Sequence, residues 1–350
     1  SVNGTNSVIL SVDDDYRVNV SDTASANNGF HNGTIAVSNF TRTGSIQGNV
    51  SINGGTLKID NSDNTVGGNL VFGGGALEVG EGNTTDYASK ILNSTGAIHI
   101  RTTNAQNVTL GALDASNTGG LRKTGEGTLT LSAVNAYTGN TSVEAGKLMV
   151  NGSIASSAVT VVTNAGTIGG SGTVGDLVIA DGGTLAPGNS PGTLFAASAT
   201  WTNGGSYDWE ILDAIGSAGA IDGWDLLDVA GTLSLTGLSN SSFTINLITL
   251  SDSTTPGPMA NFNSATNYSW MIARATTISS FNASLFQLYT GAFSNAYTGT
   301  FGITNGTYEG DQALFLTYTG GGEAIPEPGT WAASALLAAT AGFMRWRRRR

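Results

Sequence analysis

The chain has 350 residues, of which 50 are glycine, 11% are charged and none is cysteine. Without cysteine, disulfides, thiolate metal sites and cysteine nucleophiles are excluded. The net charge of −11 disfavours nucleic-acid binding, because few cations can neutralise phosphates. Hydrophobic residues still make up 39% of the chain, so the surplus glycine predicts tight turns between many short strands rather than disorder.

A short phrase, Gly-x-Leu-x-apolar, recurs along residues 1–200 and once beyond them. The copies are GGTLKID (54–60), GGALEVG (74–80), EGTLTLS (126–132), AGKLMVN (145–151), AGTIGGS (165–171), GGTLAPG (182–188) and AGTLSLT (230–236). Their central apolar residues, from Leu57 to Leu233, are separated by 20, 52, 19, 20, 17 and 48 residues. A period near twenty residues is typical of a solenoid, in which the two long gaps would hold two or three units each.

Within a copy, apolar and polar residues alternate as in a strand with one buried face. Leu129 and Leu131 face one side, and Thr128 and Thr130 face the other. Stacked coils would bury the apolar side in a continuous core. The alternative is a β-sandwich with hairpin turns, but glycine-rich strands fix hairpin register poorly. We therefore predict an all-β protein with a Gly-rich parallel β-solenoid over residues 1–200.

Residues 201–319 are richer in aromatic side chains and contain longer apolar strands, such as 243–250 and 313–318. This composition predicts a β-rich cap that closes the last coil of the solenoid. Four aromatic residues are candidates for stacking on sugar rings, namely Trp201, Tyr207, Trp209 and Trp224. We favour the alternative that these rings pack in the core of the cap.

Residues 320–350 differ from the rest of the chain. A Gly/Pro linker (320–330) contains Pro326, Glu327 and Pro328, and an apolar run with a basic end follows over 331–350. The arginines of that end are Arg345, Arg347, Arg348, Arg349 and Arg350. We expect a short hydrophobic helix in the membrane, whose arginines lie on the cytoplasmic side. The alternative for the Pro-Glu-Pro segment is a rigid hinge before an ordinary anchor.

The Pro-Glu-Pro motif, the hydrophobic run and the Arg-rich end, in this order, resemble the PEP-CTERM sorting signal. The resemblance implies export, transient anchoring in the inner membrane by the C-terminal helix, and cleavage near Pro326, Glu327 and Pro328 by an exosortase, a membrane-bound protease or transpeptidase. These three residues would be recognised as part of a substrate, and the arginines would act as the membrane stop. The processed protein would then reach the cell surface or the extracellular space.

Residues 119–194 resemble the autotransporter-associated β-strand repeat. The resemblance is carried by 120–131, 137–141 and 146–148, and by the segment 182–194 that often follows the repeat. It implies a right-handed parallel β-helix of the passenger type, in agreement with the twenty-residue period. An autotransporter ends in a membrane β-barrel, whereas the apolar run and arginines of this chain do not have that pattern, so we do not expect self-secretion.

Few residues suit a catalytic site. The two histidines, His31 and His99, lie in strand-like sequence rich in Thr, Asn and Ile, where we expect surface imidazoles. A site that cleaves polysaccharide would need clustered acids beside a cation. Arg274 is the only basic residue between 153 and 322, which makes such a cluster hard to build.

Acidic residues are the remaining candidates for metal or sugar binding. Asp13–Asp15 is best interpreted as a solvated run. The group Asp222, Asp225 and Asp228 could bind Ca²⁺ or line a sugar cleft, although a turn into a strand is the favoured interpretation. A calcium-binding nonapeptide begins at Gly169 but has Val174 where the aspartate belongs. We therefore expect no metal site and no cofactor.

Together these features predict an exported structural or adhesive protein of the cell surface or extracellular matrix, without enzymatic activity. The expected partners are an exosortase, exopolysaccharide and neighbouring surface proteins, but not nucleic acid. The alternative is a carbohydrate-binding or polysaccharide-degrading β-helix protein.

Overall fold

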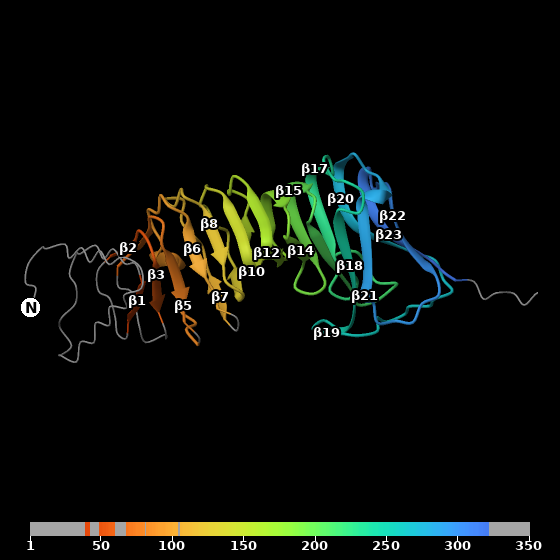
Figure 1. Cartoon of the computed structure of the whole chain (residues 1–350), viewed down its shortest axis with the longest axis horizontal. Helices are drawn as coiled ribbons and strands as arrows, with labels where there is room; N and C mark the ends of the chain where they lie inside the picture. The colour runs from red at the N-terminus through yellow and green to blue at the C-terminus, as the bar shows by residue number, and fades with distance from the viewer. Residues whose placement is uncertain (1–38, 43–48, 60–67, 81, 104–105, 322–350) are drawn as a thin grey trace, which may run out of the picture.

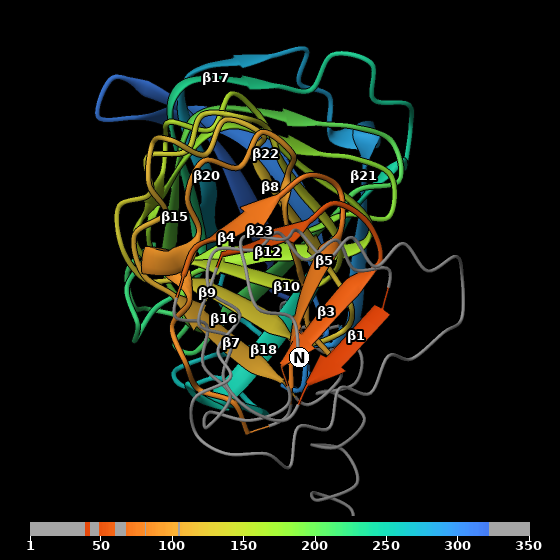
Figure 2. The same cartoon turned by 90° about the vertical axis from the view of Figure 1, so that its left-hand side faces the viewer.

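The computed structural model describes residues 39–42, 49–59, 68–80, 82–103 and 106–321. Within these ranges the chain forms strands and two single-turn 3₁₀ helices, η1 (Ala88–Lys90) and η2 (Ala283–Leu285). The strands stack side by side along an elongated body, from β1 at one end to β22 and β23 at the other (Figure 1). Seen along this axis, successive coils lie behind one another (Figure 2).

Three parallel ladders run along the body, and successive strands of a ladder come from successive coils. Ladder A contains β1 (Asn39–Arg42), β3 (Thr56–Ile59), β5 (Ala76–Val79), β6 (Ile98–Arg101) and β8 (Leu121–Thr124), and then parts of β10 (Thr141–Val150), β12 (Thr160–Gly170), β13 (Thr173–Ile179), β15 (Thr193–Trp201), β17 (Leu226–Ser234) and β20 (Tyr268–Ser279). Ladder B contains β7 (Asn107–Leu110), β9 (Thr128–Leu131), the later parts of β10 and β12, β14 (Thr184–Pro187), β16 (Ser206–Ile211), β18 (Phe243–Asp252) and β21 (Phe286–Ala292). Ladder C contains β11 (Ser153–Ile154) and the earlier parts of β13, β15, β17 and β20, while β2 (Val50–Ile52) and β4 (Leu70–Phe72) form a separate parallel pair.

The length of a coil changes along the body. In ladder A, Thr141 lies beside Thr160, and Thr160 beside Leu177, which are steps of 19 and 17 residues. Near the C-terminal end, Leu233 lies beside Ile278, a step of 45 residues. The extra residues form loops, because each coil still adds only one strand to each ladder.

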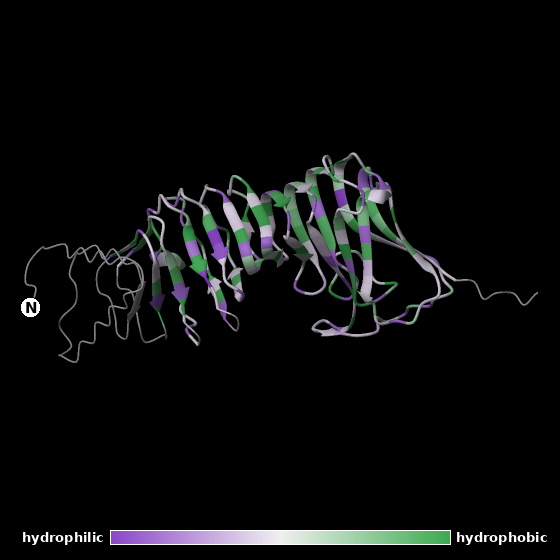
Figure 3. Ribbon diagram, viewed as in Figure 1, coloured by the Kyte–Doolittle hydropathy of each residue, from purple (hydrophilic) through white to green (hydrophobic). Residues whose placement is uncertain are grey.

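The interior is a continuous hydrophobic column. Side chains alternate along the strands, so that Leu129 and Leu131 are fully buried while Thr128 and Thr130 face outward. Figure 3 shows this alternation of hydrophobic and hydrophilic residues coil after coil. Neighbouring parallel strands lie about 4.8 Å apart, so each buried leucine or isoleucine packs on its counterpart in the next coil.

The C-terminal end departs from the parallel pattern. β23 (Asp311–Thr319) pairs antiparallel with β20, and β22 (Thr300–Tyr308) pairs antiparallel with β23. A short strand, β19 (Thr255–Pro256), folds back on β18. Aromatic rings pack beneath this end, including Trp270, whose ring centroid is 5.0 Å from that of Tyr268. The division of the chain at residue 200 stays a prediction.

The all-β fold and the parallel stacking agree with the expected β-helix. The repeated phrase occurs on two ladders. Leu57, Leu77 and Leu233 belong to ladder A, whereas Leu129 belongs to ladder B. Glycine before an alternating strand suits either ladder, which is why the apparent gaps were irregular. The expected C-terminal helix lies outside the described residues, and among those that are described no helix is long and apolar enough to cross a bilayer.

Candidate functional site

A buried lysine lies at the centre of the segment with the clearest repeat. Lys123 faces inward from β8, between Ile100 of β6 and Val143 of β10, and its side chain is 0% exposed. Its Nζ donates to the carbonyl oxygens of Thr124 at 3.1 Å, Gly125 at 2.6 Å and Ala145 at 2.9 Å. The ammonium has three hydrogens, so every donor has an acceptor.

Burial lowers the pKa of Lys123 to about 8, and the nearby charge of Glu126 opposes this shift. The side chain is therefore still mostly protonated at pH 7. Its acceptors are the last residue of β8, the glycine of the turn that follows and Ala145 in the next coil. Lys123 therefore connects two coils from inside. Gly125 is required in this turn, because its φ is +74° and a Cβ would lie 2.0 Å from the carbonyl oxygen of Thr102.

The outer face of the same coils carries a polar network. Arg122 donates to both carboxylate oxygens of Glu144, at 2.8 and 2.7 Å, and Ser142 donates to the same carboxylate at 2.9 Å. His99 lies 2.8 Å from the hydroxyl of Thr124. Burial and the positive charge of Arg122 lower the pKa of His99 to about 4, so this imidazole is neutral at pH 7.

The three aspartates of the proposed calcium or sugar group are not brought together. Asp225 is fully buried and accepts hydrogen bonds from the backbone amides of Gly192 at 2.9 Å and Glu210 at 3.0 Å. Burial, with the nearby charge of Glu210, raises its pKa well above the usual range. Asp222 is exposed in a turn, and Asp228 faces Arg274. The described residues contain no cluster of three His, Asp or Glu side chains that could hold a metal ion.

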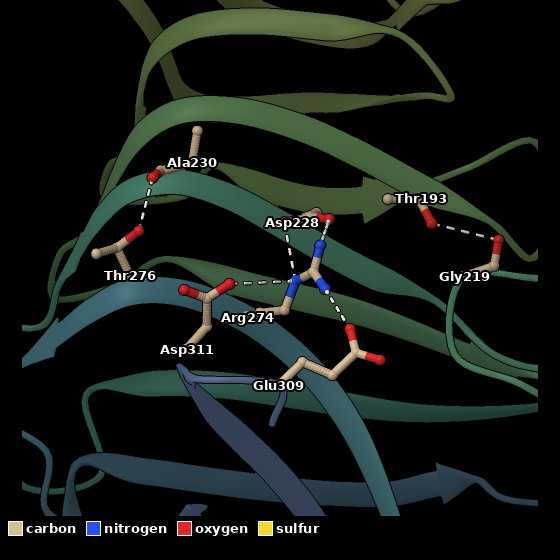
Figure 4. A network of polar contacts seen from close by, with 8 residues as sticks. All are labelled: Thr193, Gly219, Asp228, Ala230, Arg274, Thr276, Glu309 and Asp311. Atoms are coloured by element: carbon tan, nitrogen blue, oxygen red, sulfur yellow. Dashed lines mark hydrogen bonds and ion pairs between the residues drawn. The ribbon is translucent and has the colours of Figure 1, made fainter. Parts of the chain in front are cut away.

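Figure 4 shows that acids do gather around a cation near the C-terminal end, contrary to the expectation from sequence. The Nη2 atom of Arg274 lies 2.6 Å from Oδ2 of Asp228, its Nη1 lies 3.7 Å from Glu309 and its Nε lies 3.9 Å from Asp311. Residues from β17 and β20 meet because Asp228 and Arg274 are partners in the parallel register. Glu309 lies in the turn between β22 and β23, and Asp311 is the first residue of β23.

The four aromatic candidates for sugar stacking line the core, as favoured. Trp201, Tyr207 and Trp209 are fully buried, and Trp224 is 9% exposed. The ring of Trp201 stacks on Phe243, with centroids 4.6 Å apart. These rings therefore stabilise the C-terminal coils from within.

Several predicted residues lie outside the described part of the chain. They are His31, Asp13–Asp15, the motif Pro326, Glu327 and Pro328, and the arginines Arg345, Arg347, Arg348, Arg349 and Arg350. Their assignments stay predictions. Sequence reasoning missed the inward Lys123, although its place between Leu121 and the turn at Gly125 in an alternating strand was a usable signal.

Comparison with known proteins agrees with the repeat. Residues 121–150, from β8 to the end of β10, match the Passenger-associated-transport-repeat family. An extracellular serine protease of Serratia marcescens is 45% identical over 29% of this chain and 10% of its own length. A second extracellular serine protease of the same species is 39% identical over the same shares. The Adhesin BmaC autotransporter of Brucella suis biovar 1 (strain 1330) is 34% identical over 42% of this chain and 5% of its own length.

These findings show an autotransporter-type passenger repeat in the chain, which spans at most a tenth of the length of these relatives. They also correct one expectation. The sequence was interpreted as that of a protein without enzymatic activity, and two of the similar proteins are named as proteases. Composition alone could not decide whether the protein has enzymatic activity. The match covers a repeated structural segment, which does not depend on the chemistry of the rest of a protein.

Proposed function

We propose that this chain is the stalk of an exported, passenger-type surface protein. The single observation that supports this function most is the run of parallel coils through ladder A, from β1 to β20, with the passenger repeat among them. A ladder of eleven strands at about 4.8 Å per step has a length of about 48 Å. Such a column separates whatever it carries from the surface to which it is attached.

Surface labelling in the native bacterium tests this proposal. A membrane-impermeant biotin reagent should label the lysines of the chain in intact cells, and proteinase added outside should degrade it. A cytoplasmic protein of the same cells serves as the control for lysis. Labelling only after the cells are broken would refute export.

The route of sorting is a further part of the proposal. Pro326, Glu327 and Pro328, followed by the apolar run and the arginines, support recognition by an exosortase after transient anchoring in the inner membrane. The intact mass of the extracellular protein should then correspond to a chain that ends near this motif. A full-length chain confined to the membrane would refute processing, while leaving the stalk unaffected.

The names of the relatives support proteolysis and adhesion as two candidate activities of the surface protein to which this stalk belongs. Cleavage of fluorescently labelled casein, abolished by a serine-directed inhibitor, would identify the first. Retention of intact cells on a host or matrix surface, lost when the chain is deleted, would identify the second.

A further inference from the structure

An exposed tyrosine near the end of ladder B has an unusual orientation. Tyr289 faces outward from β21 and is 55% exposed. Its ring extends over Gly291, since a Cβ placed on that glycine would lie 2.3 Å from the tyrosine hydroxyl oxygen and 2.4 Å from Cζ. The ring therefore extends along the strand over Gly291, and more than half of the residue is exposed to solvent. Glycine two residues further on the same side of the strand leaves room for this position.

Polar side chains continue from Tyr289 across the two preceding coils. Asn246 of β18 is its partner in the parallel register, and Asp208 of β16 is the partner of Asn246. The amide nitrogen of Asn246 donates to Oδ1 of Asp208 at 2.6 Å. This bond fixes the amide, which keeps its carbonyl oxygen and second N–H available, while the carboxylate keeps further acceptor sites.

A second outward column runs beside the first one. Thr244 of β18 pairs with Ser206 of β16 and with Gln287 of β21, each two residues before the members of the first column. One flat face of ladder B therefore presents an aromatic ring, an orientated amide and carboxylate, and a border of hydroxyl and amide groups. The strand spacing of about 4.8 Å places all of them within reach of one short ligand.

We propose that this face, defined by Asp208, Asn246, Gln287 and Tyr289, binds a neutral glycan. The C–H groups on one face of a pyranose ring are apolar and weakly positive, which suits the negative face of the tyrosine ring. The hydroxyl groups of the sugar then donate to Asp208 and exchange hydrogen bonds with Asn246. The carboxylate of Asp208 and the net charge of −11 disfavour polyuronates and sulfated glycans. This inference does not depend on export, because it concerns binding by the chain itself.

Affinity electrophoresis of the full chain in native gels tests the proposal. Hydroxyethylcellulose and galactomannan are the neutral probes, and polygalacturonate is the acidic one. We expect one or both neutral polymers to retard the chain and the acidic polymer not to do so. No retardation by either neutral polymer, or stronger retardation by polygalacturonate, would overturn the proposal.

Three variants locate the binding face. Tyr289→Ala should weaken retardation by about tenfold or more, because the stacking surface is lost. Gly291→Ala keeps the tyrosine but displaces its ring, so it should weaken binding as well. Tyr308→Ala is the matched control, because Tyr308 is 43% exposed on β22 and lies outside this face. Equal binding by Tyr289→Ala and the unaltered chain, or equal loss in Tyr308→Ala, would overturn the assignment.

Discussion

Replacing Lys123 by methionine tests whether the passenger repeat is held together from inside. Methionine has a similar length and fills the same space, but it removes the ammonium donor from the carbonyl oxygens of Thr124, Gly125 and Ala145. The carbonyl of Thr124 keeps a second hydrogen bond, from the backbone N–H of Thr102. Hydrogen bonds from a charged donor contribute about 1.5–3 kcal/mol each, so three contribute about 4–9 kcal/mol. Removing a buried ammonium returns several kcal/mol of desolvation. We therefore expect a net loss of about 3–5 kcal/mol.

Hydrogen exchange is the suitable assay, because coils of a solenoid can open locally and a single melting temperature does not resolve them. The amides of β8 and β10 should exchange about a hundredfold faster or more in Lys123→Met, since each 1.4 kcal/mol is a factor of ten. The amides of β20 should be unchanged. Lys147→Met is the control, because Lys147 lies on the outward side of β10 and is only half-buried.

Unchanged exchange in β8 and β10 would refute the reasoning. An equal acceleration in Lys147→Met would refute it too, since the effect would then come from lost charge or side-chain packing and not from the three carbonyls.

Three further predictions concern other parts of the body. Gly120→Ala should lower the free energy of unfolding by about 3 kcal/mol or more, because Gly120 has φ +83° and its Cβ would lie 2.0 Å from the carbonyl oxygen of Asn140. The control Gly237→Ala, at φ +94° with no atom within 4 Å, should lower it by only about 1 kcal/mol in thermal unfolding. In a denaturant titration, Asp225→Asn should destabilise the chain by about 1–3 kcal/mol, because an amide NH₂ would face a backbone N–H of Gly192 or Glu210. The control Asp222→Asn, at an exposed position, should have no effect. The folded-state pKa of His99 is about 4 and its ordinary value is 6.5, so the unfolded chain binds the proton first as the pH falls. Stability should therefore decrease by about 2 kcal/mol between pH 6.5 and pH 4. His99→Gln should remove this pH dependence, and an unaltered dependence would contradict the assignment.

The alternation of the strands was predictable, whereas contacts between coils were not. Leu129 and Leu131 show their buried side by local pattern alone. The meeting of Asp228 with Arg274 depends on a step of 46 residues, which no motif in the sequence announces. Coil lengths near the C-terminal end vary because loops are inserted, so the partner of a residue can be found only when the register is known.

Aromatic residues show the same limit. Tryptophan was expected to be the platform if any ring bound sugar, but the large apolar rings are the ones that burial favours most. Tyr289 was overlooked because its exposure follows from its outward place in β21 and from Gly291, and both are matters of three-dimensional position. The buried Lys123 was overlooked because a lysine in a strand is usually assigned to the solvent side.

The number of residues in each coil differs between the two ends of the body. A step from Thr141 to Thr160 uses 19 residues and a step from Leu233 to Ile278 uses 45, although each advances the column by the same strand spacing of about 4.8 Å. Where coils are short, each added step therefore needs few residues, and gain or loss of one such coil would change the length of the column by one strand spacing. The long C-terminal coils use more residues per step and gain surface loops, so new specificity can arise there while the short N-terminal coils set the length of the body.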